Sequence, residues 1–317
     1  MRIAVDVMGG DYAPVEVIAG AIKWIQENDS QIVMIGQEEL IKEELTKYCY
    51  DSSRLSIVNA REVIAMDESP ATAIRRKRDA SIVVASKMVK EKQADALISC
   101  GSTGAQMAAA IFILGRMDGV ERPPIVAAIP NTSGKKTLLI DVGANVDCKA
   151  KQLLQFAILG KAYASFSGNP NPRVALLNNG EEESKGNNLS IETHALLKEQ
   201  PGLNFVGNIE GRELFGNHCD VVICDGFTGN IVLKTMEGMA MFMARLITME
   251  TGQLPSFFNQ LDYSKAGGAP LLGVNGVSIV CHGSSRQEAV FNGIRIAAEC
   301  VTRQMVKLQQ EELAKII

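Results

Sequence analysis

The chain has 317 residues, of which 46% are hydrophobic and 21% are charged, and its formal net charge is −4. This length and apolar content allow a large buried core, arranged as one α/β domain or two smaller ones. The mixed charges and slight acidic excess exclude a non-specific nucleic-acid binder, which carries a strong basic excess.

Short runs rich in Val, Ile and Leu alternate with longer helical patterns. Strands are expected at 2–7, 31–36, 55–60, 94–100, 124–130, 136–142, 173–178, 203–208 and 220–225, with a further apolar stretch at 271–281. Helices are expected at 14–28, 37–49, 79–92, 103–115, 150–166, 187–199, 228–250 and 285–313. This alternation predicts a Rossmann-like three-layer α/β/α sandwich with a mostly parallel sheet. No Pro- or Ser-rich linker divides the chain, so we expect one domain over 1–317 with an irregular segment at about 240–270.

The cysteines and histidines argue against disulfides and metals. The seven cysteines form no CxxC pair, and their odd number favours free thiols in a reducing cytosol. The three histidines lack the spacing of metal ligands, so no metal is expected. The N-terminus starts with a strand-like run rather than a signal peptide, and no apolar run is long enough to span a membrane. We therefore expect a cytoplasmic protein.

Turns rich in Gly, Ser, Thr, Asn and Asp follow several of the expected strands. They are DVMGGD (6–11), SCGSTGA (99–105), DVGANVD (141–147), NNGEEESKGN (178–187), CDGFTGN (224–230) and HGSS (282–285). In such folds ligands bind beyond the carboxyl ends of the strands, and glycine lets backbone N–H groups approach an anion. The pattern predicts an anion site, with phosphate as the first guess. The alternative is that these residues only form turns and helix caps.

Three familiar signatures are missing from these turns. The tract NTSGKKT (131–137) lacks the first glycine of a P-loop and has Lys where Ser or Thr should stand. The turn after the first strand is not GxGxxG, and no GxSxG nucleophile elbow occurs. Neither a mononucleotide, a dinucleotide nor a serine-hydrolase site is indicated.

An ordered set of motifs spanning residues 3 to 291 resembles bacterial phosphate acyltransferase. The motifs are DVMGGDYAP, AIRRKR, GSTGA, RPPI, LLIDVGANVDCK, EEESKGN, NFVGNIEGRE, DGFTGNIVLKTMEG, GGAPLLGV and HGSS. The sequence departs from the family pattern at Val7, Tyr12, Ser102 and Ala150, where Ala, His, Asn and Pro are usual. The segment before GGAPLLGV is also shorter than usual.

The resemblance implies a cytosolic homodimer that converts acyl-acyl carrier protein (acyl-ACP) and phosphate into acyl phosphate and holo-ACP, without a metal or organic cofactor. A membrane-bound glycerol-phosphate acyltransferase then uses the product in phospholipid synthesis. In the family, the region near 240–270 forms a short helical projection linked to dimerisation and to peripheral membrane contact.

Phosphate is itself the nucleophile in this reaction, so the site needs hydrogen-bond donors rather than a catalytic triad. We expect Lys185 and Asn230 to act on phosphate or on the developing charge, although Lys185 could be an ordinary surface lysine. His282 is expected to orient a group or donate a proton, with a structural role as the alternative. The expected phosphate-binding and supporting residues are Asp6, Gly9, Gly10, Asp11, Gly101, Ser102, Thr103, Gly104, Asn145, Gly186, Asn187, Asp225, Gly226, Thr228, Gly229, Gly283 and Ser284.

The densest basic run is Arg75, Arg76, Lys77 and Arg78. Acyl carrier protein is acidic, so we expect this run to bind it. Two alternatives stay open, namely that Arg75 or Arg76 reaches the phosphate, or that the run is a solvated helix start.

The acyl chain requires an apolar surface. Apolar residues surround the helix expected at 228–250, and methionine adapts to irregular partners. This helix could line an acyl tunnel, form a dimer contact, touch lipid or simply pack in the core. The residues concerned are Met236, Met239, Met241, Phe242 and Met243, and a second apolar patch is expected at Leu254, Pro255, Phe257 and Phe258.

Two rival functions share many of these features. A phosphate acetyltransferase-type enzyme would use short-chain acyl-CoA and need no long apolar channel. A non-catalytic acyl-ACP-binding protein would keep the basic run and the apolar helix, but Lys185 and Asn230 would be dispensable.

Overall fold

Two β-sheets form the framework of the computed structural model, which describes residues 1–255, 258 and 267–315. The first compact unit consists of Met1–Arg116 and the described residues from 267 to Val306. The second unit consists of Met117 to the described residues before 262, together with residues from Lys307 onward. The single functional domain expected over 1–317 stays a prediction, and within it the chain folds as these two units.

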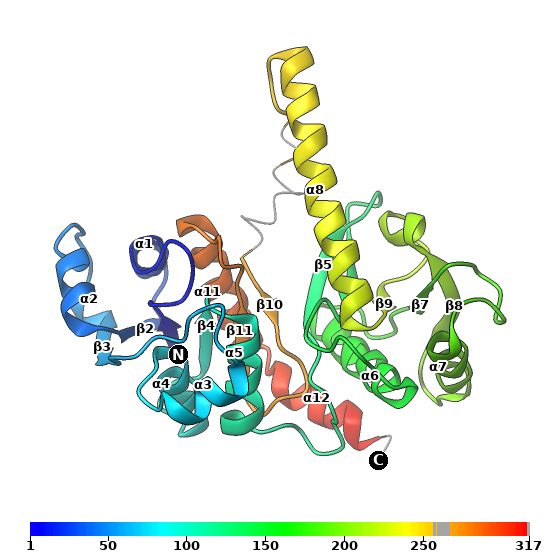
Figure 1. Cartoon of the computed structure of the whole chain (residues 1–317), viewed down its shortest axis with the longest axis horizontal. Helices are drawn as coiled ribbons and strands as arrows, with labels where there is room; N and C mark the ends of the chain where they lie inside the picture. The colour runs from blue at the N-terminus through cyan, green and yellow to red at the C-terminus, as the bar shows by residue number, and fades with distance from the viewer. Residues whose placement is uncertain (256–257, 259–266, 316–317) are drawn as a thin grey trace. The chain divides into compact units, whose positions relative to one another are not determined.

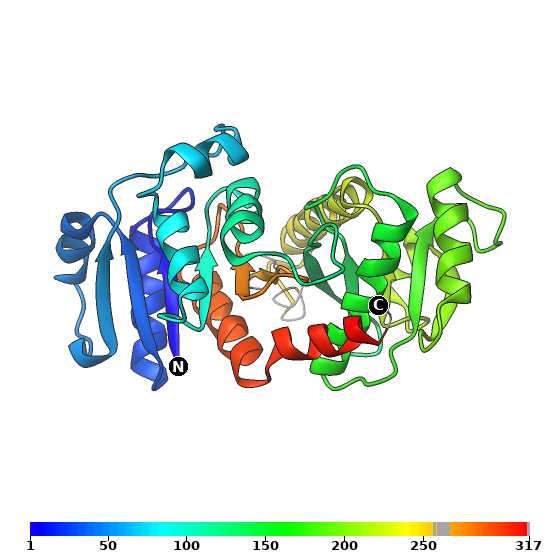
Figure 2. The ribbon, with the colours of Figure 1, turned by 90° about the horizontal axis from the view of Figure 1, so that it is seen from below.

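The sheet of the first unit has the strand order β10-β11-β4-β1-β2-β3 and is parallel except for β10. Figure 2 shows β1, β2 and β3 side by side in shades of blue. Residues Ile3, Ala4 and Val5 of β1 are fully buried, which accounts for the continuous apolar character of this strand. The strands are β1 (Arg2–Asp6), β2 (Gln31–Gly36), β3 (Leu55–Asn59), β4 (Ala96–Ser99), β10 (Ala269–Pro270) and β11 (Val277–Val280).

Helices cover both faces of this sheet. Helices α1 and α11 pack together on one face, and α4 and α5 lie on the other (Figure 1). The helices are α1 (Val15–Glu27), α2 (Glu38–Leu45), α3 (Pro70–Arg76), α4 (Ser81–Lys90), α5 (Thr103–Ala109) and α11 (Gln287–Thr302), with a 3-10 turn at Ser52–Arg54 and a π turn at Ala110–Leu114. The path from β1 leads to β2 on one side, whereas β4 lies on the other, so the carboxyl ends of β1 and β4 form the topological switch point.

The sheet of the second unit has the order β5-β6-β9-β7-β8, with β5 antiparallel to β6 and the other pairs parallel. Its strands are β5 (Val126–Pro130), β6 (Lys136–Ile140), β7 (Val174–Asn178), β8 (Phe205–Glu210) and β9 (Val221–Ile223). Its helices are α6 (Ala150–Phe166), α7 (Asn188–Glu199), α8 (Gly226–Thr251) and, from Lys307 onward, α12 (Met305–Ala314), with a 3-10 turn at Gly211–Phe215. Residues 131–135 of the NTSGKKT tract form the β5–β6 hairpin turn, where the Asn131 side chain accepts from the Ser133 and Lys135 N–H groups.

These observations confirm the expected α/β fold class and differ from the expected elements at three places. The helix expected over 285–313 is two helices, α11 and α12, separated at Gln304, whose φ is +55° (Figure 2). Helix α3 was not among the expected helices. The segment expected to be irregular from 240 is regular α-helix up to Thr251. All seven cysteines are free, as expected.

Helix α8 packs on its own unit only at its beginning. Gly226 and Gly229 are its buried residues, and the helix then extends away from the sheet of the second unit (Figure 1). Met239, Met241 and Phe242 are each more than half exposed. The expected apolar patch beyond the helix is only partly present, because Leu254 is exposed but Phe258 is buried, and Phe257 lies outside the described residues. Within the described residues, no helix is long and apolar enough to cross a membrane.

Candidate functional site

Three of the expected glycine-rich turns meet in the first unit, beyond β1, β4 and β11. We call residues 6–11, 99–104 and 282–285 the N-terminal turn cluster. The Asp11 N–H donates to the Gly283 carbonyl at 2.8 Å. A Cβ on Gly9 would lie 2.6 Å from the Gly101 nitrogen, and one on Gly10 would lie 3.1 Å from the Gly283 oxygen. The close packing of these turns requires the glycines that the sequence places there.

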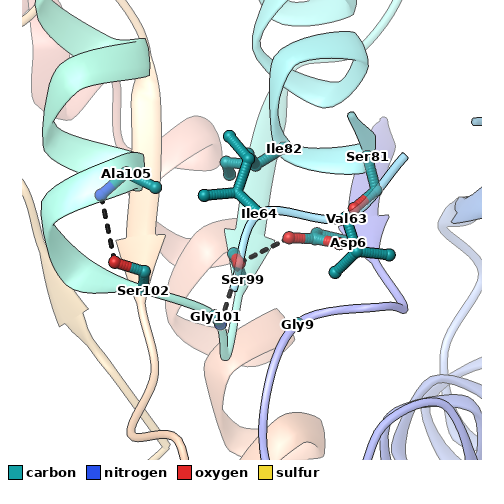
Figure 3. A pocket seen from close by; sticks show the side chains of 10 residues that line it. All are labelled: Asp6, Gly9, Val63, Ile64, Ser81, Ile82, Ser99, Gly101, Ser102 and Ala105. Atoms are coloured by element: carbon teal, nitrogen blue, oxygen red, sulfur yellow. Dashed lines mark hydrogen bonds between the residues drawn. The ribbon is translucent and has the colours of Figure 1, made fainter. Parts of the chain in front are cut away.

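A small pocket opens between the turns after β1 and β4, at the switch point of the sheet (Figure 3). The Ser99 hydroxyl donates to Asp6 Oδ2 at 2.7 Å and accepts from the Gly101 N–H at 3.1 Å. This chain of hydrogen bonds joins the carboxyl end of β1 to the turn after β4. The pocket is lined by Asp6, Gly9, Val63, Ile64, Ser81, Ile82, Ser99, Gly101, Ser102 and Ala105.

Asp6 is buried at the base of this pocket, and burial raises the pKa of its carboxyl above the usual value of 3.8. Hydrogen bonds from Ser99 and from the Met8 N–H oppose this shift by favouring the ionised form. Burial and these hydrogen bonds therefore act on the pKa of the Asp6 carboxyl in opposite directions, and burial has the larger effect.

The raised pKa of Asp6 predicts a specific pH dependence of stability. The folded protein holds the Asp6 proton more tightly than the unfolded chain, so this group stabilises the fold fully below about pH 3.8. Its contribution is lost as the pH rises from there through the raised pKa. We expect the free energy of unfolding of wild type, minus that of Asp6→Asn, to fall with rising pH, as measured by urea unfolding between about pH 4 and 8. Parallel pH curves would show that Asp6 titrates normally.

His282 and Ser284 form a local turn in the same cluster. His282 is exposed, and its Nδ1 lies 2.7 Å from the Ser284 hydroxyl and accepts from the Ser284 N–H at 3.2 Å. Because a backbone N–H can only donate, Nδ1 is an acceptor and the ring proton sits on Nε2. In this tautomer the Nε2–H group is available as a donor.

The turn after β4 begins α5 at Thr103. The Ser102 hydroxyl accepts from the Ala105 N–H at 3.3 Å, so its oxygen caps the helix. A Cβ on Gly104 would lie 2.7 Å from Pro70 Cγ, which places the beginning of α3 directly against this turn. The basic run that follows Pro70 is therefore part of the same local structure.

The members of the basic run differ in their surroundings. Arg75, Arg76 and Arg78 are exposed, and the Arg75 guanidinium lies 5.3 Å from the centre of the Phe112 ring. Lys77 pairs with Glu68 at 2.6 Å and donates to the Val63 carbonyl at 2.8 Å. Lys77 thus ties the end of α3 to Val63 and Glu68, and its expected part in carrier binding stays a prediction.

A second group of expected residues gathers in the second unit around Asp141, which follows β6. We call residues 141–145 and 224–230 the Asp141 cluster. The buried Asp141 carboxylate accepts from the Ile125, Ala144 and Asn145 N–H groups at 2.9, 3.2 and 2.6 Å, and from Asn145 Nδ2 at 2.9 Å. Burial nevertheless raises the pKa of this carboxyl.

The Asp141 cluster positions the beginning of α8. The Asn145 carbonyl accepts from the Gly226 N–H at 2.7 Å, and Asp225 caps the helix by accepting from the Thr228 N–H and hydroxyl at 2.9 and 2.7 Å. The carboxylate of Asp225 and the hydroxyl of Thr228 are thus paired with each other. Asn230 follows one turn later, and a Cβ on Gly143 would lie 3.5 Å from its Cγ.

Lys185 lies in the exposed loop between β7 and α7. Its carbonyl accepts from Asn178 Nδ2 at 3.0 Å, and Asn187 caps α7 by accepting from the Ser190 N–H at 2.9 Å. Gly186 has φ of +100°, and a Cβ there would overlap the Ser190 hydroxyl. The ε-amino group of Lys185 has no partner among the described residues. Lys185 and Asn230 follow the adjacent strands β7 and β9, and no hydrogen bond of the structure joins them.

The described residues contain no cluster of three or more His, Cys, Asp or Glu side chains able to hold a metal ion.

Comparison with known proteins places the chain in a family. The model of a family described as "Fatty acid synthesis protein" matches residues 1–308. A phosphate acyltransferase from Syntrophomonas wolfei is 68% identical over 318 residues, covering 100% of this chain and 99% of that protein. The chain belongs to the fatty acid synthesis protein family. The resemblance to bacterial phosphate acyltransferase that the motifs indicated is confirmed.

Solved structures support the fold but not a particular reaction. A phosphotransacetylase from Streptococcus pyogenes superposes with a TM-score of 0.65 at 19% identity, covering 97% of this chain and 94% of that chain. A 4-hydroxythreonine-4-phosphate dehydrogenase from Klebsiella pneumoniae gives 0.59 at 13% identity, covering 95% and 99%. Because an acyl-transfer enzyme and a dehydrogenase share this fold, the fold alone does not select the chemistry.

Sequence reasoning missed several residues that shape the candidate site. Ser99 lies within the turn SCGSTGA but was not among the expected site residues. The available signal was a polar serine at the end of a buried strand, where it hydrogen-bonds to Asp6 of the neighbouring strand. Ser81 and Ile64 line the pocket from segments far from β1 in the sequence, and no local pattern marks them. The Pro123 carbonyl accepts from Asn145 Nδ2 at 2.9 Å, which joins the RPPI segment to the DVGAN turn.

Proposed function

We propose that this protein is a phosphate acyltransferase, which moves a fatty acyl group from a thioester to inorganic phosphate. The observation that carries this proposal is the 68% identity to a phosphate acyltransferase over the full length of both chains. The match of the fatty acid synthesis family model to residues 1–308 supports a fatty acyl group as the substrate class.

The reaction needs two substrates held together more than it needs a nucleophilic side chain. A phosphate oxygen attacks the thioester carbonyl carbon, and the carbonyl π electrons move to oxygen to give a tetrahedral oxyanion. Collapse of this intermediate breaks the C–S bond, releasing acyl phosphate and a thiolate that takes up a proton. Hydrogen-bond donors aimed at the oxyanion lower the barrier.

We assign the donor roles to residues with free hydrogen-bonding capacity. The ε-amino group of Lys185 and the side-chain amide of Asn230 are proposed to act on phosphate or the oxyanion. His282 is proposed to orient the leaving sulfur or the oxyanion by donating a hydrogen bond from Nε2–H, since Nδ1 is engaged by Ser284. The N–H groups of the glycine-rich turns singled out in the sequence are proposed as candidates for holding phosphate.

The acyl donor is proposed to be acyl-ACP with a long chain. The exposed apolar side chains of α8 support a role at a surface rather than in a tunnel, so we propose that α8 forms a homodimer contact and a peripheral membrane contact. We further infer a cytoplasmic protein whose acyl phosphate passes to a membrane glycerol-phosphate acyltransferase. The short-chain acyl-CoA enzyme and the non-catalytic ACP-binding protein are the rival functions.

One assay separates these functions. Purified protein is incubated with palmitoyl-ACP and phosphate, and acyl phosphate and free thiol are measured. We expect both products in equal amounts, and none when phosphate is omitted. Strong turnover of acetyl-CoA but not of palmitoyl-ACP would instead identify the short-chain enzyme. Tight binding of ACP without turnover of either donor would identify a binding protein.

A further inference from the structure

Three arginines on and after α3 have no acidic partner in the part of the chain that the structure describes. Arg75, Arg76 and Arg78 are exposed, and none of their guanidinium groups forms an ion pair. Other arginines are paired, for example those at positions 54, 173 and 286 with Asp51, Asp220 and Glu16. Exposed guanidinium groups without partners can bind an external carboxylate without first breaking an internal ion pair.

The acidic residues around α3 leave these arginines free. Glu68 pairs with Lys77 at 2.6 Å, and Asp79 lies 4.0 Å from Arg61. Asp67 is exposed before the helix. Charged side chains of both signs therefore surround α3, but the unpaired positive ones are concentrated at its end.

The α3 segment is held firmly in place. Ala73 and Ile74 are buried, and Lys77 ties the end of the helix to the Val63 carbonyl at 2.8 Å. At the other end, Pro70 packs against Gly104. A fixed backbone lowers the conformational entropy that the segment loses on binding a partner.

Two exposed apolar side chains flank the arginines. Phe112 is 52% exposed beneath the Arg75 guanidinium, and Met66 is 53% exposed. Aromatic residues, Met and Arg are enriched in protein interfaces, so this combination is typical of a protein-binding surface. An anionic membrane is less well matched, because the larger set of exposed apolar side chains lies on α8.

The same segment borders the pocket of the first unit. Val63 and Ile64, shortly before α3, line the pocket together with Ser102. Met66 lies beside the 282–285 turn of the cluster, because its Cε would be 3.0 Å from a Cβ added to Gly283. A partner bound on α3 would therefore present a flexible attached group next to the N-terminal turn cluster.

We propose that Arg75, Arg76 and Arg78, flanked by Met66 and Phe112, form the docking surface for an acidic face of the protein that carries the acyl thioester. This inference rests on the proposed function, from which the carrier-bound donor comes. Lys77 is not part of the surface, because its side chain is engaged with Glu68. Charge complementarity at such a surface mainly accelerates association and selects the partner.

The test compares a carrier-bound with a small donor of the same acyl group. The kcat/KM for palmitoyl-ACP is divided by that for palmitoyl-CoA, in wild type and in the triple variant Arg75→Glu, Arg76→Glu, Arg78→Glu. We expect this ratio to fall at least about tenfold in the triple variant. Added salt should lower the ratio in wild type more than in the variant, because it screens exposed charges.

Lys90→Glu is the matched control for the single variant Arg76→Glu, since each reverses one exposed charge in the first unit. Lys90 is the last residue of α4 and precedes the amino end of β4, whereas the turns follow the carboxyl ends of the strands. Arg76→Glu should lower the ratio, whereas Lys90→Glu should leave it unchanged. Thermal unfolding of each variant shows whether it is folded, and Arg76→Glu alone carries the test if the triple variant is not.

Several outcomes would overturn the docking surface. Equal losses with both donors would place the arginines in catalysis or folding, and an unchanged ratio would remove them from carrier recognition. Loss of binding to vesicles containing anionic lipid, with an unchanged ratio, would make this surface a membrane contact. If wild type turns over neither donor, the proposed function fails instead, and titration with holo-ACP then decides whether the three arginines bind the carrier.

Discussion

Replacing Lys185 by alanine is expected to lower kcat with palmitoyl-ACP and phosphate by about 10²–10³. The lysine side chain is exposed and its ε-amino group has no partner in the described chain, so its removal leaves no unpaired buried group. The loop is held by main-chain and neighbouring groups, namely the Lys185 carbonyl with Asn178 and the Asn187 cap of α7. Alanine preserves these contacts, and the thermal unfolding midpoint should stay close to that of wild type.

Lys198→Ala provides the control for this prediction. Lys198 lies on the neighbouring α7 and forms an exposed pair with Glu183 at 2.6 Å, an interaction that contributes little to stability. The Lys198→Ala substitution removes the same type of charge from the same region, but from a residue with no proposed catalytic role. A Lys185→Ala enzyme with a rate equal to that of Lys198→Ala would reduce Lys185 to an ordinary surface lysine.

Substituting Gly229 by alanine is expected to lower the free energy of unfolding by about 3 kcal/mol and also to lower kcat. The added methyl would overlap the Asp141 carbonyl oxygen and lie 2.9 Å from Cys224 Sγ, so the first turn of α8 must move. Asn230 is the next residue, and a displacement of about 1 Å in a substrate-positioning group can cost about 10²-fold in rate. Urea unfolding and steady-state kinetics measure the two effects separately.

The same helix contains the matched control. Gly238 is exposed, and a Cβ there would meet no atom within 4 Å. Gly238→Ala should therefore be neutral or raise the free energy of unfolding by up to about 1 kcal/mol, because alanine favours helix over glycine. If both alanines had the same effect, the close packing between α8 and the end of β6 would not determine stability.

The sequence predicted the individual elements better than their assembly. Runs such as Arg2–Asp6 and Gln31–Gly36 are apolar between their first and last residues, so both their type and their ends were readable. The division into two sheets was not readable, because it depends on which strands pair, and pairing is decided by contacts distant in sequence. The break at Gln304 was missed for a different reason, since helical periodicity continues on both sides of a single residue with positive φ.

The candidate site was predictable where glycine is required by close approach. Gly9 and Gly229 stand where a Cβ would collide with the main chain, and both lie in turns that composition had marked. The partners of the polar residues could not be predicted, because Asp6 meets Ser99 across 93 residues and Asp141 meets Ile125 across a hairpin. The different surroundings of Lys77 and its arginine neighbours likewise depend on Glu68 and Val63, which only folding brings alongside.

Among the described residues of α8, the buried ones lie in its first turn, next to the candidate catalytic amide of Asn230. Asn230 and Met249 lie about 28 Å apart along this helix, at about 1.5 Å per residue. A surface or partner that contacts the outer apolar side chains would therefore contact the same continuous helix that carries Asn230.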